Sequence, residues 1–115
     1  MLRFNVKFDI NQNEEKIEER IKRVQARIDS QVLKDSNYYC PLDTSMLQRS
    51  GITNTKIGSG KIIWNTPYAR FQYYNAPRKN KDKNPNASQK WFEVAKSKCK
   101  ETWEKIANEE YRQNN

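Results

Sequence analysis

The chain has 115 residues, a length that suits one domain able to bury a core without metal or disulfides. Its 22 lysine and arginine residues against 14 aspartate and glutamate residues give a charge of +8, which suits either an anionic partner or a solvated basic surface. The lack of histidine excludes a histidine-based catalytic triad, and the two cysteines, Cys40 and Cys99, match no zinc-binding pattern. No stretch is long and apolar enough to span a bilayer, so we expect assembly in a cytoplasm.

The first third of the chain predicts a strand followed by a long helix. Residues 2–10 alternate strictly between apolar and polar side chains, which is typical of a half-buried strand. A helical pattern follows and ends between Leu33 and Ser36. Its apolar residues recur at steps of three and four, so that they share one helix face: Ile17, Ile21, Val24, Ile28 and Val32.

The middle of the chain predicts short elements. Residues 37–50 read as an irregular connection with a short helical turn through Met46, capped by Asp43 or Thr44. Two β-prone runs, 52–57 and 61–65, flank a Gly-Ser-Gly turn and predict a hairpin. Pro67 favours a short helix over residues 68–74, and an aromatic strand is the alternative.

The last third predicts a loop and a second long helix. Residues 75–90 combine lysine, asparagine and proline with almost no apolar side chain, which indicates a mobile basic loop. A helix follows over about residues 88–111, with Ser88 as its cap. Cys99 lies on its apolar stripe and should be buried, whereas Cys40, in a turn, should be partly exposed.

The order of these elements predicts one α+β domain over residues 1–115. Two long amphipathic helices would cover a small antiparallel sheet made of the N-terminal strand and the hairpin. No catalytic or cofactor-binding motif is recognisable: Asp43, beside Thr44, is best explained as a turn or helix cap, and no acidic cluster has metal-ligand spacing. We therefore expect a protein that is not an enzyme and needs no metal or cofactor.

Aromatic residues next to the basic loop leave two interpretations open. Tyr68, Phe71, Tyr73 and Tyr74 could stack on bases while the lysines contact phosphates, as in a small basic nucleic-acid-binding protein. The simpler explanation is that they pack in the core or at a subunit interface, where aromatic residues are enriched.

Two strings resemble a known family. They are CPLDTSMLQRS, from Cys40 to Ser50, and PYARFQYY, from Pro67 to Tyr74. A Pro-x-Asp-Thr-Gly-x-Leu-x-x-Ser pattern, then a hairpin, then Tyr-Ala and aromatics is similar to small neck proteins of tailed double-stranded DNA phages. The chain resembles the phage minor capsid protein family, which is related to tail-completion and head–tail connector proteins. Ser45 stands where that family usually has glycine. A site that needs positive φ would strain this serine, and we favour an ordinary or locally adjusted backbone there.

The resemblance implies a structural protein of the virion, assembled at the head–tail junction as a ring, with other neck, portal-side or tail proteins as partners. A monomer in isolation is compatible with that role, and no membrane contact is implied. Diffuse contact with passing DNA would suit the charge, because base-specific contacts would hinder sliding. The expected site residues fall into three groups: Asp43, Thr44 and Arg49 shape the loop; Tyr68, Arg70, Phe71 and Tyr73 make interface contacts; Arg78, Lys79, Lys81 and Lys83 meet DNA or acidic protein.

Overall fold

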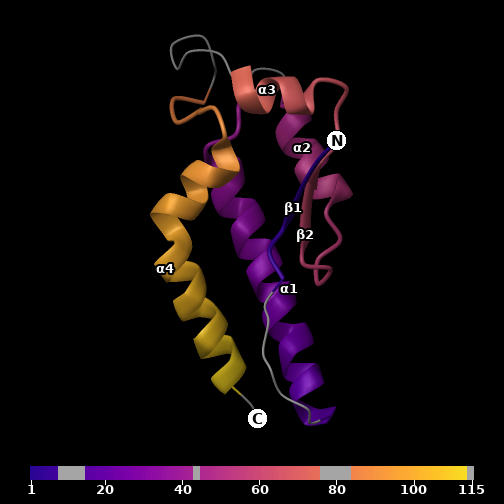
Figure 1. The fold of residues 1–115 in the computed structure, drawn as a ribbon, viewed down its shortest axis with the longest axis vertical. Helices are drawn as coiled ribbons and strands as arrows, with labels where there is room; N and C mark the ends of the chain where they lie inside the picture. Colours follow the sequence, from indigo (N-terminus) through magenta and orange to yellow (C-terminus); the bar gives the residue numbers. More distant parts are fainter. Residues whose placement is uncertain (8–14, 43–44, 76–83, 114–115) are drawn as a thin grey trace.

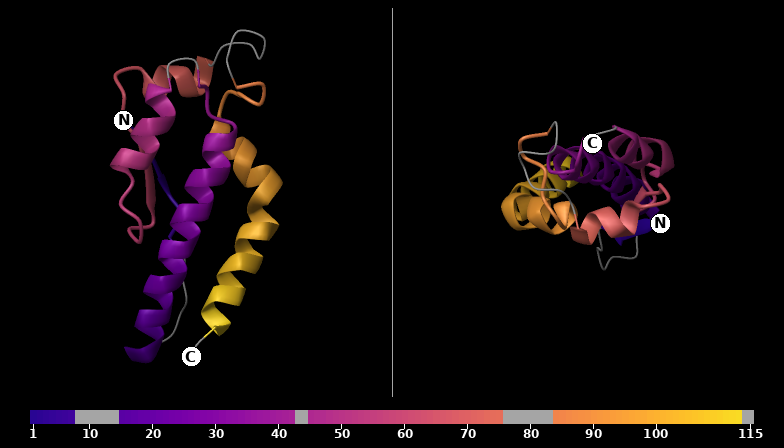
Figure 2. Two further views of the ribbon diagram at one scale, coloured as in Figure 1. Left: turned by 180° about the vertical axis from the view of Figure 1, so that it is seen from behind. Right: turned by 90° about the horizontal axis from the view of Figure 1, so that it is seen from above.

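The computed structural model describes residues 1–7, 15–42, 45–75 and 84–113. Along the chain its elements are β1 (Leu2–Asn5), α1 (Glu15–Tyr38), α2 (Met46–Asn54), β2 (Lys61–Trp64), α3 (Ala69–Asn75) and α4 (Trp91–Arg112). The molecule is elongated, with extents of 50 × 25 × 18 Å. α1 runs through its middle, with α4 along one side and the sheet and α2 along the other (Figure 1). α3 lies across one end, as the view from above in Figure 2 shows.

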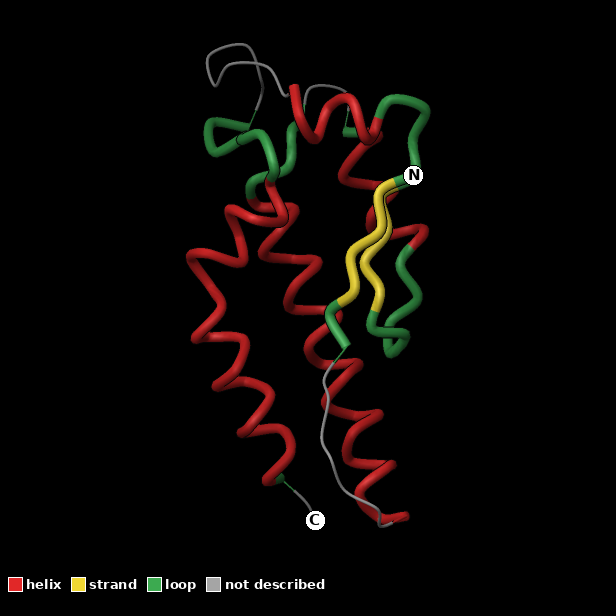
Figure 3. Tube along the Cα trace, in the orientation of Figure 1, coloured by secondary structure: helices red, strands yellow, loops and turns green. Residues whose placement is uncertain are grey.

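The sheet within the described residues consists of β1 and β2, paired antiparallel (Figure 3). Leu2 lies opposite Trp64 and Phe4 lies opposite Ile62. The predicted alternation holds in β1, where Leu2 is buried and Arg3 is exposed, while residues 8–10 lie outside the described residues. Helices packed on an antiparallel sheet confirm the predicted α+β class.

An aromatic cluster joins the sheet to α3 and α4. Trp64 and Trp91 are fully buried and meet edge to face, with ring centroids 5.8 Å apart. Phe4 stacks on Phe92 at 4.3 Å, which brings β1 against the start of α4. The apolar stripe predicted for the first helix is buried in the same core through Val24, Ile28 and Val32. These contacts, and not any single polar bond, hold the layers together.

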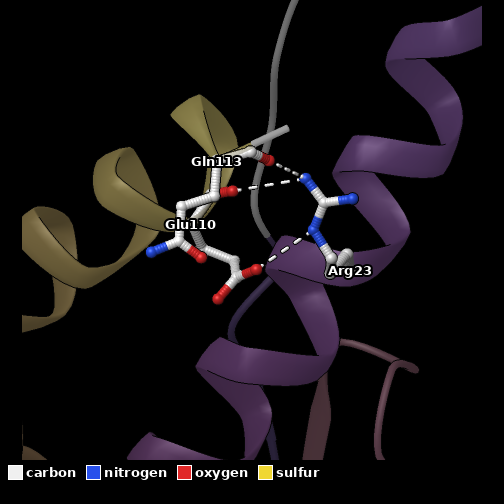
Figure 4. Close-up of polar contacts among 3 residues, drawn as sticks. All are labelled: Arg23, Glu110 and Gln113. Carbon is white, nitrogen blue, oxygen red and sulfur yellow. Dashed lines mark hydrogen bonds and ion pairs between the residues drawn. The ribbon is translucent and has the colours of Figure 1, made fainter. Parts of the chain in front are cut away.

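Polar contacts connect α1 to α4 at two separate positions. Arg23 Nε lies 3.0 Å from Glu110 Oε2, and the same guanidinium donates to the backbone carbonyls of Glu110 and Gln113 (Figure 4). Further along, Trp103 Nε1 donates to Asp35 Oδ2 at 2.7 Å. Because the Arg23 side chain is 44% exposed, its ion pair contributes roughly 1 kcal/mol or less, and the apolar contacts dominate.

The predicted hairpin between residues 52–57 and 61–65 is wrong. Residues 46–54 form α2, and β2 pairs with β1 instead. A short run that mixes apolar and polar residues cannot be assigned by periodicity, and the pairing of β1 with β2 is non-local. Gly51 allows the helix to lie there: a Cβ at this position would come within 2.5 Å of the Trp64 side chain.

Two backbone expectations were also wrong. Ser45, just before α2, has φ 60° and is left-handed, so serine occupies the conformation for which glycine is suited. Ser88 does not cap α4: Lys90, with φ 50°, precedes the helix, and its amide donates to the Tyr73 carbonyl at 2.7 Å. This bond to α3 fixes where α4 begins. The first long helix also continues to Tyr38, beyond the predicted end.

The two cysteines exchange their expected environments. Cys40 is buried and Cys99 is half-buried, and neither forms a disulfide among the described residues. Cys40 is covered because the chain returns over it: the Asn84 side-chain amide donates to the backbone carbonyls of Cys40 and Tyr38 at 3.0 and 2.8 Å. Asn84 and Ala87, assigned to the basic loop from sequence, are therefore buried, and residues 76–83 lie outside the described residues.

Candidate assembly interface

α3 divides its aromatic side chains between the core and the surface. Ala69 and Tyr73, one turn apart, are buried, and Tyr73 is only 1% exposed. Phe71 and Tyr74 are 65% and 52% exposed, and Tyr68, in the turn before the helix, is 72% exposed. Residues four apart share a helix face, so burial of Ala69 and Tyr73 leaves the others outside. We call Tyr68, Phe71 and Tyr74 the outer aromatic residues.

Tyr73 anchors the helix that carries these outer residues. Its ring meets Trp91 edge to face at 4.8 Å and lies 5.2 Å from Phe4. Its hydroxyl is buried and has no hydrogen-bond partner in the described part of the chain. The anchor is therefore apolar packing plus the backbone bond from Lys90. Because Tyr73 packs on Phe4 of β1 and on Trp91 of α4, the outer aromatic residues are presented on a short helix whose position is fixed.

A shallow pocket adjoins the outer aromatic residues where α2 begins. It has a volume of about 280 Å³ and is lined by Met46, Leu47, Thr66, Pro67, Tyr68 and Gln72. Met46 is 61% exposed beside it. Methionine and aromatic side chains are enriched at protein interfaces, where they fill irregular surfaces. An apolar surface thus extends from α3 to the start of α2.

A second apolar surface lies between α1, α2 and the loop after α2. This α1–α2 groove has a volume of about 370 Å³ and is lined by Ser30, Leu33, Lys34, Asn37, Gln48, Ile52 and Ile57. Ile52 and Ile57 are both exposed. The chain therefore carries two different apolar surfaces, the property that a head-to-tail contact between copies requires.

The residues predicted as site residues are only partly brought together. Tyr68 and Phe71 lie at the surface and Arg70 is exposed beside them, whereas Tyr73 lies in the core. Arg49 is exposed on α2, and its backbone amide donates to the Ser45 carbonyl at 3.1 Å. The remaining predicted residues lie outside the described residues: Asp43, Thr44, Arg78, Lys79, Lys81 and Lys83.

Met46 was not expected at this surface from sequence, and Tyr74 was named only as an aromatic residue beside the basic loop and not among the expected interface contacts. The usable signal for Tyr74 was its position three residues after Phe71, which places both on the same side of a helix. No comparable signal existed for Met46, because its exposure depends on how α2 is placed beside α3.

Two titratable groups near the junction of α1 and α4, Cys99 and Tyr39, have raised pKa values. Burial raises the pKa of the Cys99 thiol, and the nearby Asp35 carboxylate raises it further. Burial also raises the pKa of Tyr39, with smaller contributions from Cys99, Tyr38 and Asp35. A thiol with a raised pKa holds little thiolate at neutral pH and is a poor nucleophile. No group of three or more potential metal ligands occurs among residues 1–7, 15–42, 45–75 and 84–113.

The described helices include none that is both long and apolar enough to cross a membrane. Comparison with protein-family models matches residues 4–110 to a family described as minor capsid protein. Neither the curated proteins nor the solved structures contain a match. The matched range includes all of α2, β2 and α3, so both apolar surfaces lie within it.

Proposed function

The chain belongs to the minor capsid protein family, and on that premise we propose that it assembles at the head–tail junction as a subunit of a neck, connector or tail-completion ring. Family membership makes it a structural protein of a phage virion that interacts with other virion proteins. The position at the junction and the ring are our proposal. The observation that carries it is the set of outer aromatic residues, held on a fixed helix and facing away from the core.

Exposed aromatic residues of this kind are expected to be covered in the assembly. A buried aromatic side chain removes about 150–250 Å² from water, which corresponds to a few kcal/mol at about 25 cal/mol per Å². Three of them beside Met46 are enough to form the centre of a contact between subunits, since few residues carry most of the binding energy.

The second apolar surface supplies a complementary side for a ring. A ring is built from heterologous contacts, in which one surface of each subunit meets a different surface of the next. In our proposal the outer aromatic residues of one subunit enter the α1–α2 groove of its neighbour, against Leu33, Ile52 and Ile57. The exposed Lys34 at that groove leaves a polar rim around the apolar contact.

The net charge of +8 suits a ring through which DNA passes. A basic ring tolerates DNA that slides through it, because phosphate contacts carry no base specificity. Contact through Arg78, Lys79, Lys81 and Lys83 stays a prediction. Direct DNA binding would weaken steeply as salt rises, whereas a ring held by apolar contacts would not, so a salt titration of each property separates the two.

The proposal is tested by negative-stain microscopy of lysates from a phage with an amber mutation in this gene. We expect filled heads and finished tails that fail to join, or tails that end abnormally, and we expect joining to return when the wild-type gene is supplied in trans. Normal, infectious particles from the mutant would reject the position at the junction.

A further inference from the structure

The two edges of the small sheet differ in whether their outward main-chain amides are hydrogen-bonded. Three side-chain hydroxyls close the outer edge of β2. Ser59 Oγ accepts from the Lys61 amide at 3.2 Å and Thr55 Oγ1 accepts from the Ile63 amide at 3.0 Å. Ser50 Oγ accepts from the amide of Asn65 at 3.2 Å, just beyond the strand. These are alternate residues, the ones whose amides point away from β1. Another strand therefore finds no free donor along this edge.

Among the described residues, no side chain closes the outer edge of β1 in this way. The Val6 amide donates to the Gly60 carbonyl, and Leu2 and Phe4 lie opposite Trp64 and Ile62 in the same register. In an antiparallel pair the intervening residues, Arg3 and Asn5, direct their amides and carbonyls outward. Within the described residues no hydrogen bond reaches these main-chain groups, and both residues are exposed. Beyond them the Lys7 amide donates to Asn5 Oδ1 at 3.3 Å.

We propose that this edge is a docking site, at which an extended, acidic segment of another virion protein adds a third strand beside β1. The inference goes beyond the position at the head–tail junction and rests only on the structural role in the virion. An extended segment can satisfy the outward main-chain groups of Arg3 and Asn5 in register. A third strand also suits the sheet, because two strands alone are marginally stable.

The charges on β1 identify the chemistry of the occupant. Arg3 and Lys7 are exposed on one face of the strand, and Lys61 is exposed opposite Asn5. No acidic residue occurs in the described residues of β1 or in β2. Acidic side chains at alternate positions of the added strand would pair with this face, whereas β1 of a second copy would place like charges side by side. On the other face Phe4 and Val6 pack against the core and are half-buried, so apolar residues of the same segment would lie beside them at the edge of the core.

The main-chain part of the proposal is tested with Asn5→Pro. Proline removes the outward amide without touching a bond to β2, leaves the charge unchanged, and is tolerated at a strand edge. Asn5→Ala keeps the amide and is the matched control. Each variant gene is supplied to the null phage, and its protein is quantified in purified particles by mass spectrometry. We expect roughly tenfold less Asn5→Pro protein than wild type in particles, and wild-type amounts of Asn5→Ala. Equal amounts of Asn5→Pro and wild type would overturn the docking edge.

A second pair of substitutions tests the acidic occupant and does not depend on proline. Arg3→Glu combined with Lys7→Glu reverses two exposed charges and should lower incorporation, while the melting temperature of the isolated protein stays unchanged. Arg3→Lys combined with Lys7→Arg is the control. Normal incorporation of the charge-reversed protein would overturn the acidic assignment.

Sedimentation of the isolated protein tests whether a second copy occupies the edge instead. In that case the protein would form a dimer that Asn5→Pro abolishes. We expect no such dimer, and its detection would overturn the proposal. Failure of the proposed position at the head–tail junction would be seen separately, as normal particles from the null phage.

Discussion

Two sets of aromatic residues meet at α3 and lie in opposite environments. The inner set, Phe4, Trp64, Tyr73 and Trp91, packs ring against ring and joins β1, β2, α3 and α4. The outer set, Tyr68, Phe71 and Tyr74, is exposed on and beside α3. Composition does not distinguish them. If our proposal holds, substitutions in the inner set should change the free energy of unfolding, whereas those in the outer set should change assembly and leave folding intact.

The largest effect on stability is expected for Trp64→Ala. Trp64 is fully buried, contacts Phe4 and Trp91, and donates through Nε1 to Asn37 Oδ1 at 3.0 Å. Its loss should lower the free energy of unfolding by about 3–5 kcal/mol, measured by denaturant titration. A change below about 1 kcal/mol would mean that the inner set does not hold the layers together.

Gly51→Ala should have the next largest effect. The added methyl group would lie against the Trp64 indole and within 3.1 Å of Leu33, so α2 must shift from the sheet. Overpacking of this kind costs about 1–3 kcal/mol, partly offset by about 1 kcal/mol of better helix propensity. Thr53→Ala, exposed on the same helix, is the control and should be nearly neutral. Greater stability of Gly51→Ala than of the control would contradict the close contact between α2 and β2.

Tyr73→Phe sharpens the comparison because it keeps the inner ring and removes only a buried hydroxyl that has no partner in the described residues. A buried polar group left unsatisfied costs about 1–3 kcal/mol, so the free energy of unfolding should be unchanged or higher. Chemical denaturation of both proteins measures this. A loss of more than about 1 kcal/mol would show that the hydroxyl is satisfied in solution.

The smallest effect on stability is expected for Tyr68→Ser and Phe71→Ser together. Both side chains are exposed, so the free energy of unfolding should stay within about 0.5 kcal/mol of wild type. Particle yield in complementation of the null phage should nevertheless fall. Lys96→Ser, an exposed change on α4, controls for altered surface polarity. Full particle yield from the double variant would show that the outer set is not part of the assembly interface.

The long helices were predictable because their patterns repeat many times. The spacing from Val24 to Val32 and from Phe92 to Ala107 each covers several turns, and these residues are buried as expected. The middle of the chain was not predictable in the same way. Six residues after Gly51 do not define a period, and nothing local indicates that Ile62 pairs with Phe4.

The candidate site was predictable only in part for the same reason. Tyr68 and Phe71 were named from sequence, but a seven-residue helix cannot show which of Phe71 and Tyr73 faces the core. That choice is made by Trp91 and Phe4, which come from distant parts of the chain and cover Tyr73. The open edge of β1 likewise follows from pairing with β2, which no local pattern reveals.

The most direct test of the central claim is a cryo-electron microscopy reconstruction of the phage neck at a resolution that traces side chains. We predict that the chain forms a ring between head and tail, with Tyr68 and Phe71 of each subunit covered by the α1–α2 groove of its neighbour. Density for the chain elsewhere in the virion, or a ring in which these side chains face solvent, would contradict the account.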